Sequence, residues 1–321
     1  MRQPDELSMA SHSVKRPSPD LARPSDSRCH GLVTLKRRLH KAVSVFFRQT
    51  DNFCLTNGIE YPGGPAISER FAALGLTPQA EPEEHPARWF AEDGVLIGEQ
   101  DTPGSGYGGY LVTEQAYGDF ELLMEMRPDW PADTGVMLRR RPDSWEGFQV
   151  LVDHRPSGGI GGFFGNGLAS FSAVPFAVDV ATDDDGRPVG LVADYPETSV
   201  EPVTEEKRAR LAYAADVEDF LNVWRWDDWN ELRIRCVGAL PVISTWINGL
   251  KIAELDTATL NSPNYNPTDV LGVLGERGHI ALEVHDNDAM FGEARWGKGA
   301  QCRWRNMRIK ELDHDTEKDT A

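Results

Sequence analysis

The sequence predicts an all-β architecture of antiparallel strands, arranged as a sandwich or a barrel, on three observations. In the segment 231–237, apolar and charged residues alternate, which is the period of a strand buried on one face. A second apolar run, 242–247, is followed by Asn248-Gly249, a strong hairpin signal because both turn positions favour positive φ. Short runs of this kind, separated by turn residues, recur from Arg88 onward, as they do in sandwiches and barrels.

Six candidate strands lie in the first half of this region. Each is a short run bounded by residues that favour turns, such as Gly, Pro, Asn and Asp. No regular alternation of strands with helices appears, which disfavours a doubly wound parallel sheet. The six segments are 94–97, 109–113, 120–127, 135–139, 147–152 and 160–164.

A long insert, residues 171–222, separates these strands from the rest. Inserts between strands of a sandwich are usually loops over one end or face, and such loops often carry function. The insert contains a predicted helix at 205–215 and the acidic run 183–186, which lacks the ligand spacing and terminal Glu of a calcium loop and is predicted to be a solvated turn. Five further candidate strands are 231–237, 242–247, 251–255, 278–285 and 302–311.

Residues 1–84 are predicted to be a basic, largely irregular extension and linker before a β domain at 85–315. Residues 1–30 are rich in Ser, Pro and Arg and are typical of disorder. An amphipathic pattern at 31–49 predicts a short helix that packs on the domain, with a basic membrane-surface helix as the alternative. A second short helix is expected at 68–74.

Composition limits the function classes. The chain has 321 residues, 40% of them hydrophobic, and a formal net charge of −18. Residues 1–50 carry more Lys and Arg than Asp and Glu, so the net charge of the rest of the chain is more negative than −18. Nucleic acid is therefore disfavoured as a partner, since phosphate contacts need clustered basic side chains. A neutral ligand such as a sugar suits this charge.

The four cysteines form no Cys-x-x-Cys pair, so no zinc motif is present, and Cys236 and Cys302 are expected to be small buried residues of strands. No apolar run reaches the length of a membrane span. No signal peptide is evident, so we expect a cytoplasmic protein by default, with an extracytoplasmic location as the alternative. The oligomeric state is left open.

Seven short motifs follow one another in order: 111–122, 133–139, 147–150, 158–165, 229–230 with 246–249, 278–285, and 305–309. Together they resemble the 3-keto-disaccharide hydrolase family. The resemblance covers roughly residues 88–313. It implies a two-sheet antiparallel jelly-roll sandwich of the concanavalin A-like lectin and glucanase type.

The resemblance also implies a reaction on a glycoside already oxidised to a ketone at C3. A base removes the acidified C2 proton, the C1 substituent leaves with the help of an acid, and water adds to the enone. Such chemistry needs a base near neutral pH and polar groups at the enolate oxygen. The alternatives are a non-catalytic carbohydrate-binding module on the same fold and an ordinary two-carboxylate glycosidase.

Strand alternation predicts which polar side chains share the face that lines a cleft. Gln149 and Asp153 share a face of one strand, and Glu283 and His285 share a face of another. His154 lies beside Asp153 at the strand end. We therefore expect the catalytic groups among Asp153, His154, Glu283 and His285. The alternative for His285 is a hydrogen-bonded structural role, and the alternative for Asp153 and His154 is a polar turn.

The chain departs from the family pattern at this face. Gln149 and Leu151 stand where the family motif has Glu and then Gln, and Glu283 stands where it has Gln. Gln149 cannot act as a base, so the departure implies that Glu283, or Asp153 with His154, supplies the acid–base group. No cofactor is required by the sequence and no metal site is assigned, although His and carboxylate side chains also suit a divalent metal.

Ligand contacts are expected from one basic, one amide and three indole side chains. An indole ring packs well against the C–H face of a sugar and keeps a polar edge. The alternative for the tryptophans is core packing, and the alternative for the arginine is a solvated place in a basic run. The five candidates are Arg139, Gln149, Trp145, Trp224 and Trp226.

Overall fold

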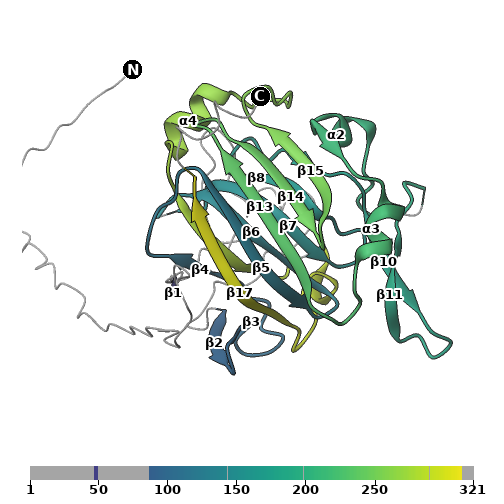
Figure 1. Cartoon of the computed structure of the whole chain (residues 1–321). Coiled ribbons are helices and arrows are strands. Elements are labelled where there is room, and N and C mark those ends of the chain that lie inside the picture. Colours follow the sequence, from purple (N-terminus) through teal and green to yellow (C-terminus); the bar gives the residue numbers. More distant parts are fainter. Residues whose placement is uncertain (1–46, 50–86, 143, 198, 289, 313–321) are drawn as a thin grey trace, which may run out of the picture. The chain divides into compact units, whose positions relative to one another are not determined.

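The computed structural model describes residues 47–49, 87–142, 144–197, 199–288 and 290–312. In this part of the chain two large antiparallel sheets pack face to face, and a two-stranded ribbon and short helices lie beside them (Figure 1). The predicted two-sheet antiparallel sandwich is confirmed. The helices expected around 31–49 and 68–74 lie outside the described residues, except that 47–49 form a strand.

One sheet has seven described strands, in the order β1-β4-β16-β6-β7-β8-β9. Its strands are far apart in the sequence, because the chain leaves after β9 and returns at β16. Their bounds are β1 Phe47–Gln49, β4 Gly109–Thr113, β6 Ala132–Arg140, β7 Gly147–His154, β8 Ile160–Asn166, β9 Ser172–Ala173 and β16 His279–Val284.

The second sheet has eight described strands, in the order β12-β15-β14-β13-β5-β17-β3-β2. It contains β2, a strand that was not predicted, which pairs with β3 as a hairpin. The bounds are β2 Arg88–Glu92, β3 Val95–Glu99, β5 Phe120–Pro128, β12 Tyr213–Ala214, β13 Asn230–Val237, β14 Val242–Ile247, β15 Leu250–Asp256 and β17 Gln301–Glu311.

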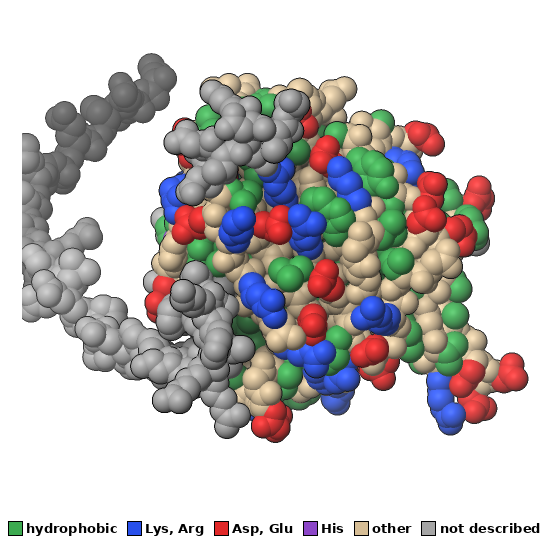
Figure 2. Space-filling view, viewed as in Figure 1, with side chains coloured by type: hydrophobic (Ala, Val, Ile, Leu, Met, Phe, Trp, Pro, Cys, Tyr) green, Lys and Arg blue, Asp and Glu red, His purple; other side chains and the backbone are tan. Residues whose placement is uncertain are grey.

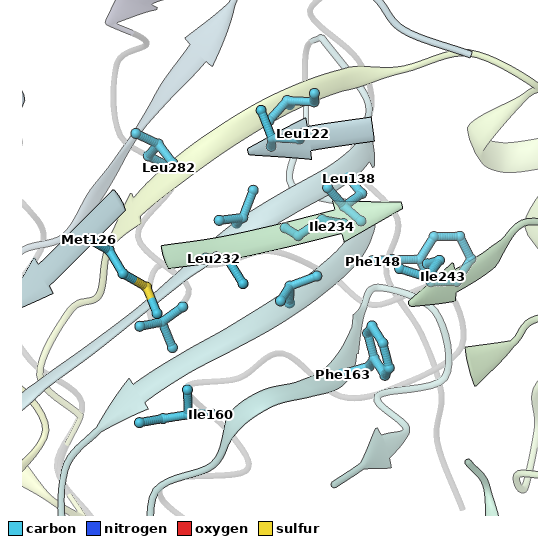
Figure 3. Packing of buried hydrophobic residues seen from close by; sticks show 14 of the residues in the cluster. Leu122, Met126, Leu138, Phe148, Ile160, Phe163, Leu232, Ile234, Ile243 and Leu282 are labelled. Atoms are coloured by element: carbon cyan, nitrogen blue, oxygen red, sulfur yellow. The ribbon is translucent and has the colours of Figure 1, made fainter. Parts of the chain in front are cut away.

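The core lies between the two sheets. Alternate residues of each strand point inward, so the inner faces meet as one apolar layer (Figure 3). The labelled side chains come from both sheets: Leu138, Phe148, Ile160, Phe163 and Leu282 from one, and Leu122, Met126, Leu232, Ile234 and Ile243 from the other. Both cysteines expected in strands, Cys236 and Cys302, are buried and free.

The predicted hairpin at Asn248-Gly249 is confirmed and is tied to the preceding loop. Asn248 and Gly249 have φ of 48° and 87°. The Asn248 side chain donates to the oxygen Oδ1 of Asn230 at 2.7 Å and to the backbone oxygen of Val223 at 2.7 Å. Asn230 is fully buried, and its amide bonds both backbone groups of Arg225 at 2.9 Å. The two asparagines therefore fix the entry to β13.

The insert forms a ribbon and two short helices along one edge of the sandwich (Figure 1). The acidic run 183–186 turns between the ribbon strands, as expected, and Asp183 Oδ1 accepts from the backbone of Asp185 and Arg187. The predicted helix at 205–215 is too long, because the chain leaves helical geometry after Ala209 and pairs with β15. The elements are β10 Val178–Thr182, β11 Pro188–Ala193, α2 Glu205–Ala209 and α3 Val217–Val223.

A third described helix, α4 Pro267–Leu274, was not predicted although the sequence carries its start signals. Asn266 caps it, accepting from the backbone of Thr268 and Asp269, and Pro267 occupies the first turn. None of the described helices combines the length and apolar character that a membrane crossing requires.

Basic and acidic side chains are interspersed on the face seen in Figure 2, without one large patch of either sign. Several of them pair across neighbouring strands of the eight-stranded sheet. Arg233 lies 2.7 Å from Glu121, and Arg305 pairs with Glu125. Because these charges are neutralised locally and partly exposed, they contribute little to stability.

Candidate functional site

A cavity of about 390 Å³ opens on the outer face of the seven-stranded sheet. Strands β6, β7 and β8 form its floor, the insert forms one wall, and the loop after β16 forms another. The lining includes Asp133, Trp145, Gln149, Asp153, Arg155, Phe164, Asn166, Glu201, Lys207, His285, Asp286, Asp288 and Arg295.

The alternation of β7 confirms the predicted assignment of its faces. Gln149 and Asp153 line the cavity, while Phe148, Val150 and Val152 lie in the core between the sheets. Although β7 is buried on both faces, its polar side chains point to the cavity and its apolar side chains point to the core, because successive residues of a strand face opposite sides. The cleft therefore lies on the side of the sheet that the pattern indicates.

Two aspartates on adjacent strands lie side by side on the cavity floor. Asp133 on β6 is the register partner of Asp153 on β7, and both carboxyl groups are buried. Arg155 lies 3.0 Å from Asp153 Oδ2 and 3.7 Å from Asp133 Oδ2. Burial raises the pKa of Asp153 well above its usual range, and the charge of Asp133 adds to this rise.

Asp153 also has an oxygen that is not satisfied within the described chain. Asp153 lines the cavity, and its Oδ1 is buried and has no hydrogen-bond partner among the described residues. Buried carboxylate oxygens are normally paired, because desolvation without a partner is costly. The lone pairs of this oxygen therefore have no competing hydrogen bond from the described residues.

His285 stands at the end of β16, beside the aspartate pair. Its Nδ1 lies 2.7 Å from the backbone oxygen of Asp286 and 3.0 Å from Asp286 Oδ1, so this nitrogen must carry a hydrogen. Burial alone lowers the pKa of His285, but the carboxylates of Asp133 and Asp286 outweigh it and raise the pKa to about 10. The imidazole is therefore charged near neutral pH.

The contact between Arg295 and His285 favours the opposite charge state. Arg295 Nη1 lies 3.1 Å from His285 Nε2, and a donor at this position calls for a lone pair on the nitrogen. We favour the charged ring, because the surrounding carboxylates outnumber the one guanidinium. In that state Nε2 directs its hydrogen toward Asp133 Oδ2, 3.9 Å away, or into the cavity.

Two arginines brace the aspartates and share an aromatic ring. Arg295 donates to Asp133 Oδ2 at 2.7 Å and lies 3.0 Å from Asp288 Oδ2. The guanidinium carbons of Arg155 and Arg295 lie 4.4 Å and 4.9 Å from the ring centroid of Phe291. The ring face attracts both cations, which holds them close together despite their like charge.

Glu283 lies beside the cavity and does not line it. It is buried, its Oε1 accepts from the Tyr110 hydroxyl at 2.8 Å, and its Oε2 accepts from Gln149 Nε2. Burial raises the pKa of Glu283 to about 7, with Asp133 acting in the same direction and His285 in the other. The sequence placed Glu283 in the cleft, whereas the neighbouring side chains cover it.

Three predicted site residues lie on the other side of the sheet. His154 follows Asp153 in β7, so alternation turns it away from the cavity. On that other side its ring centroid lies 5.5 Å from that of Trp224 and 5.3 Å from that of Trp226. Trp224 also packs on Phe220 of α3. Burial lowers the pKa of His154 to about 4. The expected catalytic and sugar-binding roles of His154, Trp224 and Trp226 do not fit this placement.

Strand alternation also predicts the wrong position for the Arg139 side chain. Its backbone has φ of 54°, and the pairing of β6 with β16 shifts register at this point. The side chain is consequently buried away from the cavity, where it donates to the backbone oxygen of Gly238 at 3.0 Å and pairs with Asp119 at 3.5 Å. Arg139 thus ties β6 to the β13–β14 turn.

Of the remaining candidates, Gln149 and Trp145 line the cavity, and their contacts with a ligand stay a prediction. Asp133 was not among the predicted site residues, although its position two residues before Gly135 places it on the same face. Arg295 and Glu201 carried no such signal, because only the fold brings their loops to the floor. Among the described residues, no group of three or more His, Cys, Asp or Glu side chains is arranged to hold a metal ion.

Comparison with known proteins gives one family match. The model of the 3-keto-alpha-glucoside-1,2-lyase-like domain matches residues 77–310. No curated protein matches the chain.

Several solved structures are similar to the chain at low sequence identity. A presumed glycosyl hydrolase from Parabacteroides distasonis is 17% identical over 70% of this chain and 90% of that one, with a TM-score of 0.39. The carbohydrate binding module CBM66 from Bacillus subtilis is 12% identical over 70% and 92%, with a TM-score of 0.38. A β-1,3-1,4-glucanase from a mouse hindgut metagenome is 12% identical over 70% and 82%, with a TM-score of 0.36.

Proposed function

The chain belongs to the 3-keto-alpha-glucoside-1,2-lyase-like domain family, whose model matches well over half of it, and on this premise we propose that its cavity cleaves 3-keto-glycosides by elimination. The family and fold indicate a carbohydrate-active or carbohydrate-binding jelly-roll protein. The main support for elimination is the buried aspartate pair, in which one oxygen of Asp153 has no partner among the described residues.

In this proposal Asp153 is the general base. It removes the proton from C2 of the sugar, and the electron pair of that C–H bond forms an enolate with the C3 ketone. A carboxylate whose pKa is raised is a stronger proton acceptor than an ordinary one. Arg155, 3.0 Å from Asp153, is the proposed partner of the developing enolate oxygen.

His285 is the proposed general acid. As the enolate collapses, the C1–O bond breaks and the leaving oxygen takes a proton from the charged imidazole, which gives an enone. Asp133 and Asp286 favour the protonated ring before the reaction. Water then adds across the enone: its hydroxide bonds to C1 as His285 takes its proton, and C2 takes back the proton held by Asp153. This gives the free 3-keto sugar and restores both groups to their starting protonation states.

The lining of the cavity suits a neutral polyol. Acidic and basic side chains pair with one another around it, so hydroxyl groups find both donors and acceptors without a large net charge. Trp145 and Phe164 supply aromatic surface of the kind that packs against the C–H face of a sugar.

Chromogenic substrates test the proposal. The purified protein is incubated with 4-nitrophenyl 3-keto-glucoside and, separately, with the unoxidised 4-nitrophenyl glucoside, and nitrophenol release and enone absorbance are followed. We expect turnover of the keto sugar alone, and a primary isotope effect when C2 carries deuterium, because the C2–H bond breaks in the reaction.

Other outcomes separate the alternatives. Turnover of the unoxidised glucoside without a C2 isotope effect would identify an ordinary glycosidase. Binding of either sugar without any turnover would identify a carbohydrate-binding module. Either result would refute elimination at C2.

A further inference from the structure

A row of hydrogen-bonded polar side chains crosses the seven-stranded sheet beside the cavity. It runs from Tyr110 on β4 through Glu283 on β16 and Gln149 on β7 to Asn166 on β8. Tyr110 and Gln149 both donate to the Glu283 carboxylate, and Asn166 Nδ2 donates to Gln149 Oε1 at 3.0 Å. Gln149 and Asn166 line the cavity, whereas Glu283 and Tyr110 do not.

The row passes over β6 at a glycine. A Cβ at Gly135 would lie 2.8 Å from Gln149 Nε2 and 2.9 Å from the backbone oxygen of Val150, which is closer than side-chain carbons pack. The missing side chain therefore leaves the gap through which Gln149 reaches Glu283 across an intervening strand.

The chemistry of the row fixes the direction of the Gln149 amide. An ionised carboxylate only accepts hydrogen bonds, so the NH₂ group of Gln149 must face Glu283. Its carbonyl oxygen then faces Asn166 and the cavity, where the second lone pair remains for a ligand hydroxyl. We infer that Glu283 is a positioning residue for ligand recognition, which holds Gln149 so that an acceptor oxygen faces the cavity.

This inference rests on the proposed function of the cavity, and it explains why a buried carboxylate is kept outside it. Several charged groups surround Glu283: Asp133 on β6, His285 at the end of β16, Asp286 after it, and Arg140, which stacks on Tyr110 at 5.0 Å. Burial raises the pKa of Glu283 to about 7, while His285 and the Tyr110 hydrogen bond act to lower it and the two aspartates act to raise it. Below this pH the protonated carboxyl no longer requires a donor from Gln149, so ligand affinity should fall.

The first test uses the isosteric substitution Glu283→Gln. Tyr110 can still donate to the new amide oxygen, which turns the new NH₂ toward Gln149 and inverts its amide. We expect KM for 4-nitrophenyl 3-keto-glucoside to rise roughly tenfold at pH 8, the effect of one lost hydrogen bond, with a smaller change in kcat. The rise of KM below about pH 7 in the wild type should disappear.

Tyr110→Phe is the matched second variant. It removes a hydroxyl that favours the ionised carboxylate but leaves the pairing of Glu283 with Gln149. KM at pH 9 should therefore stay close to the wild-type value, while the pH midpoint of KM moves upward. Asp184→Asn, an exposed isosteric change in the ribbon turn, serves as the control.

Selective ¹⁵N labelling of glutamine side chains gives a readout that does not require turnover. The Gln149 amide signal, assigned by its loss in Gln149→Met, should titrate near pH 7 in the wild type, not titrate in Glu283→Gln, and titrate at higher pH in Tyr110→Phe. If the amide titrates in this way but no sugar is turned over, the positioning stands and the elimination proposal fails. Turnover with the same KM and pH profile in Glu283→Gln as in the wild type would overturn the positioning role, as would a loss confined to kcat.

Discussion

At the scale of single residues, burial sets the chemistry of the site. Asp153 and His154 are neighbours in β7 and are both buried, yet they face opposite sides of the sheet. The aspartate meets a polar cavity and a second carboxylate, whereas the histidine meets indole rings. Desolvation raises the pKa of the acid and lowers that of the base, because in both cases it disfavours the charged form.

Asp153→Asn is expected to lower kcat by roughly 10²- to 10⁴-fold with little change in KM, since the amide keeps the shape but cannot take the C2 proton. Steady-state kinetics on the 3-keto substrate measure this. Asp184→Asn should retain full activity. Retention of more than a tenth of kcat in Asp153→Asn would assign the base elsewhere.

His154→Phe tests the buried histidine through the pH dependence of stability. The folded pKa is lowered from 6.5 to about 4, so the unfolded chain binds the proton more readily and stability is lost as pH falls through this window. Above pH 6.5 this contribution is fully present. Both proteins should lose stability between pH 7 and pH 4. The loss in the free energy of unfolding should be about 3 kcal/mol smaller in the variant than in the wild type.

Urea unfolding at several pH values measures the difference, and activity is not required. Phenylalanine preserves the aromatic packing with Trp224 and Trp226. Equal pH dependence in the two proteins would mean that His154 is accessible to protons in the folded state, which contradicts its burial.

At the scale of elements, residues at the ends of strands determine how the chain turns and which way the last side chains point. The hairpin and the entry to β13 depend on two asparagines that bond each other and the backbone of the preceding loop. A single positive φ at Arg139 likewise redirects the end of β6 and removes that side chain from the cavity.

Asn230→Ala should lower the free energy of unfolding by about 2–4 kcal/mol, because it removes a fully buried amide that bonds the backbone of Arg225 and Asp228 and the side chain of Asn248. Urea unfolding gives the value. The control is Asn222→Ala on the exposed face of α3, which should change stability by less than about 0.5 kcal/mol. A similar loss in both variants would mean that the Asn230 network adds nothing beyond a surface contact.

At the scale of the whole molecule, the cavity exists only because separate parts of the chain meet. The seven-stranded sheet supplies the aspartates, the loop after β16 supplies Arg295, and the insert supplies Glu201 and Lys207. Glu201 pairs with Arg155, so the insert is fastened to the floor beside the aspartate pair.

Glu201→Gln should loosen this attachment without unfolding the sandwich. Since Glu201 is partly exposed, we expect little change in thermal stability but a severalfold rise in KM and faster limited proteolysis within the insert. Glu206→Gln, which breaks the exposed pair with Arg210 in the same insert, is the matched control. Identical proteolysis and KM in both variants would show that the Glu201 pair does not hold the wall.

The sequence by itself determined the sandwich, the hairpin and the face of β7 and β16 that carries the polar residues, because these follow from alternation and turn chemistry, which are local. It also indicated Asp153, His285, Gln149 and Trp145 for the cavity. Only the tertiary structure decided that Glu283 is covered and that Arg139 turns away. It alone brought Arg295 and the insert to the aspartates, since contacts between distant segments, and the burial that shifts a pKa, arise only when the chain packs.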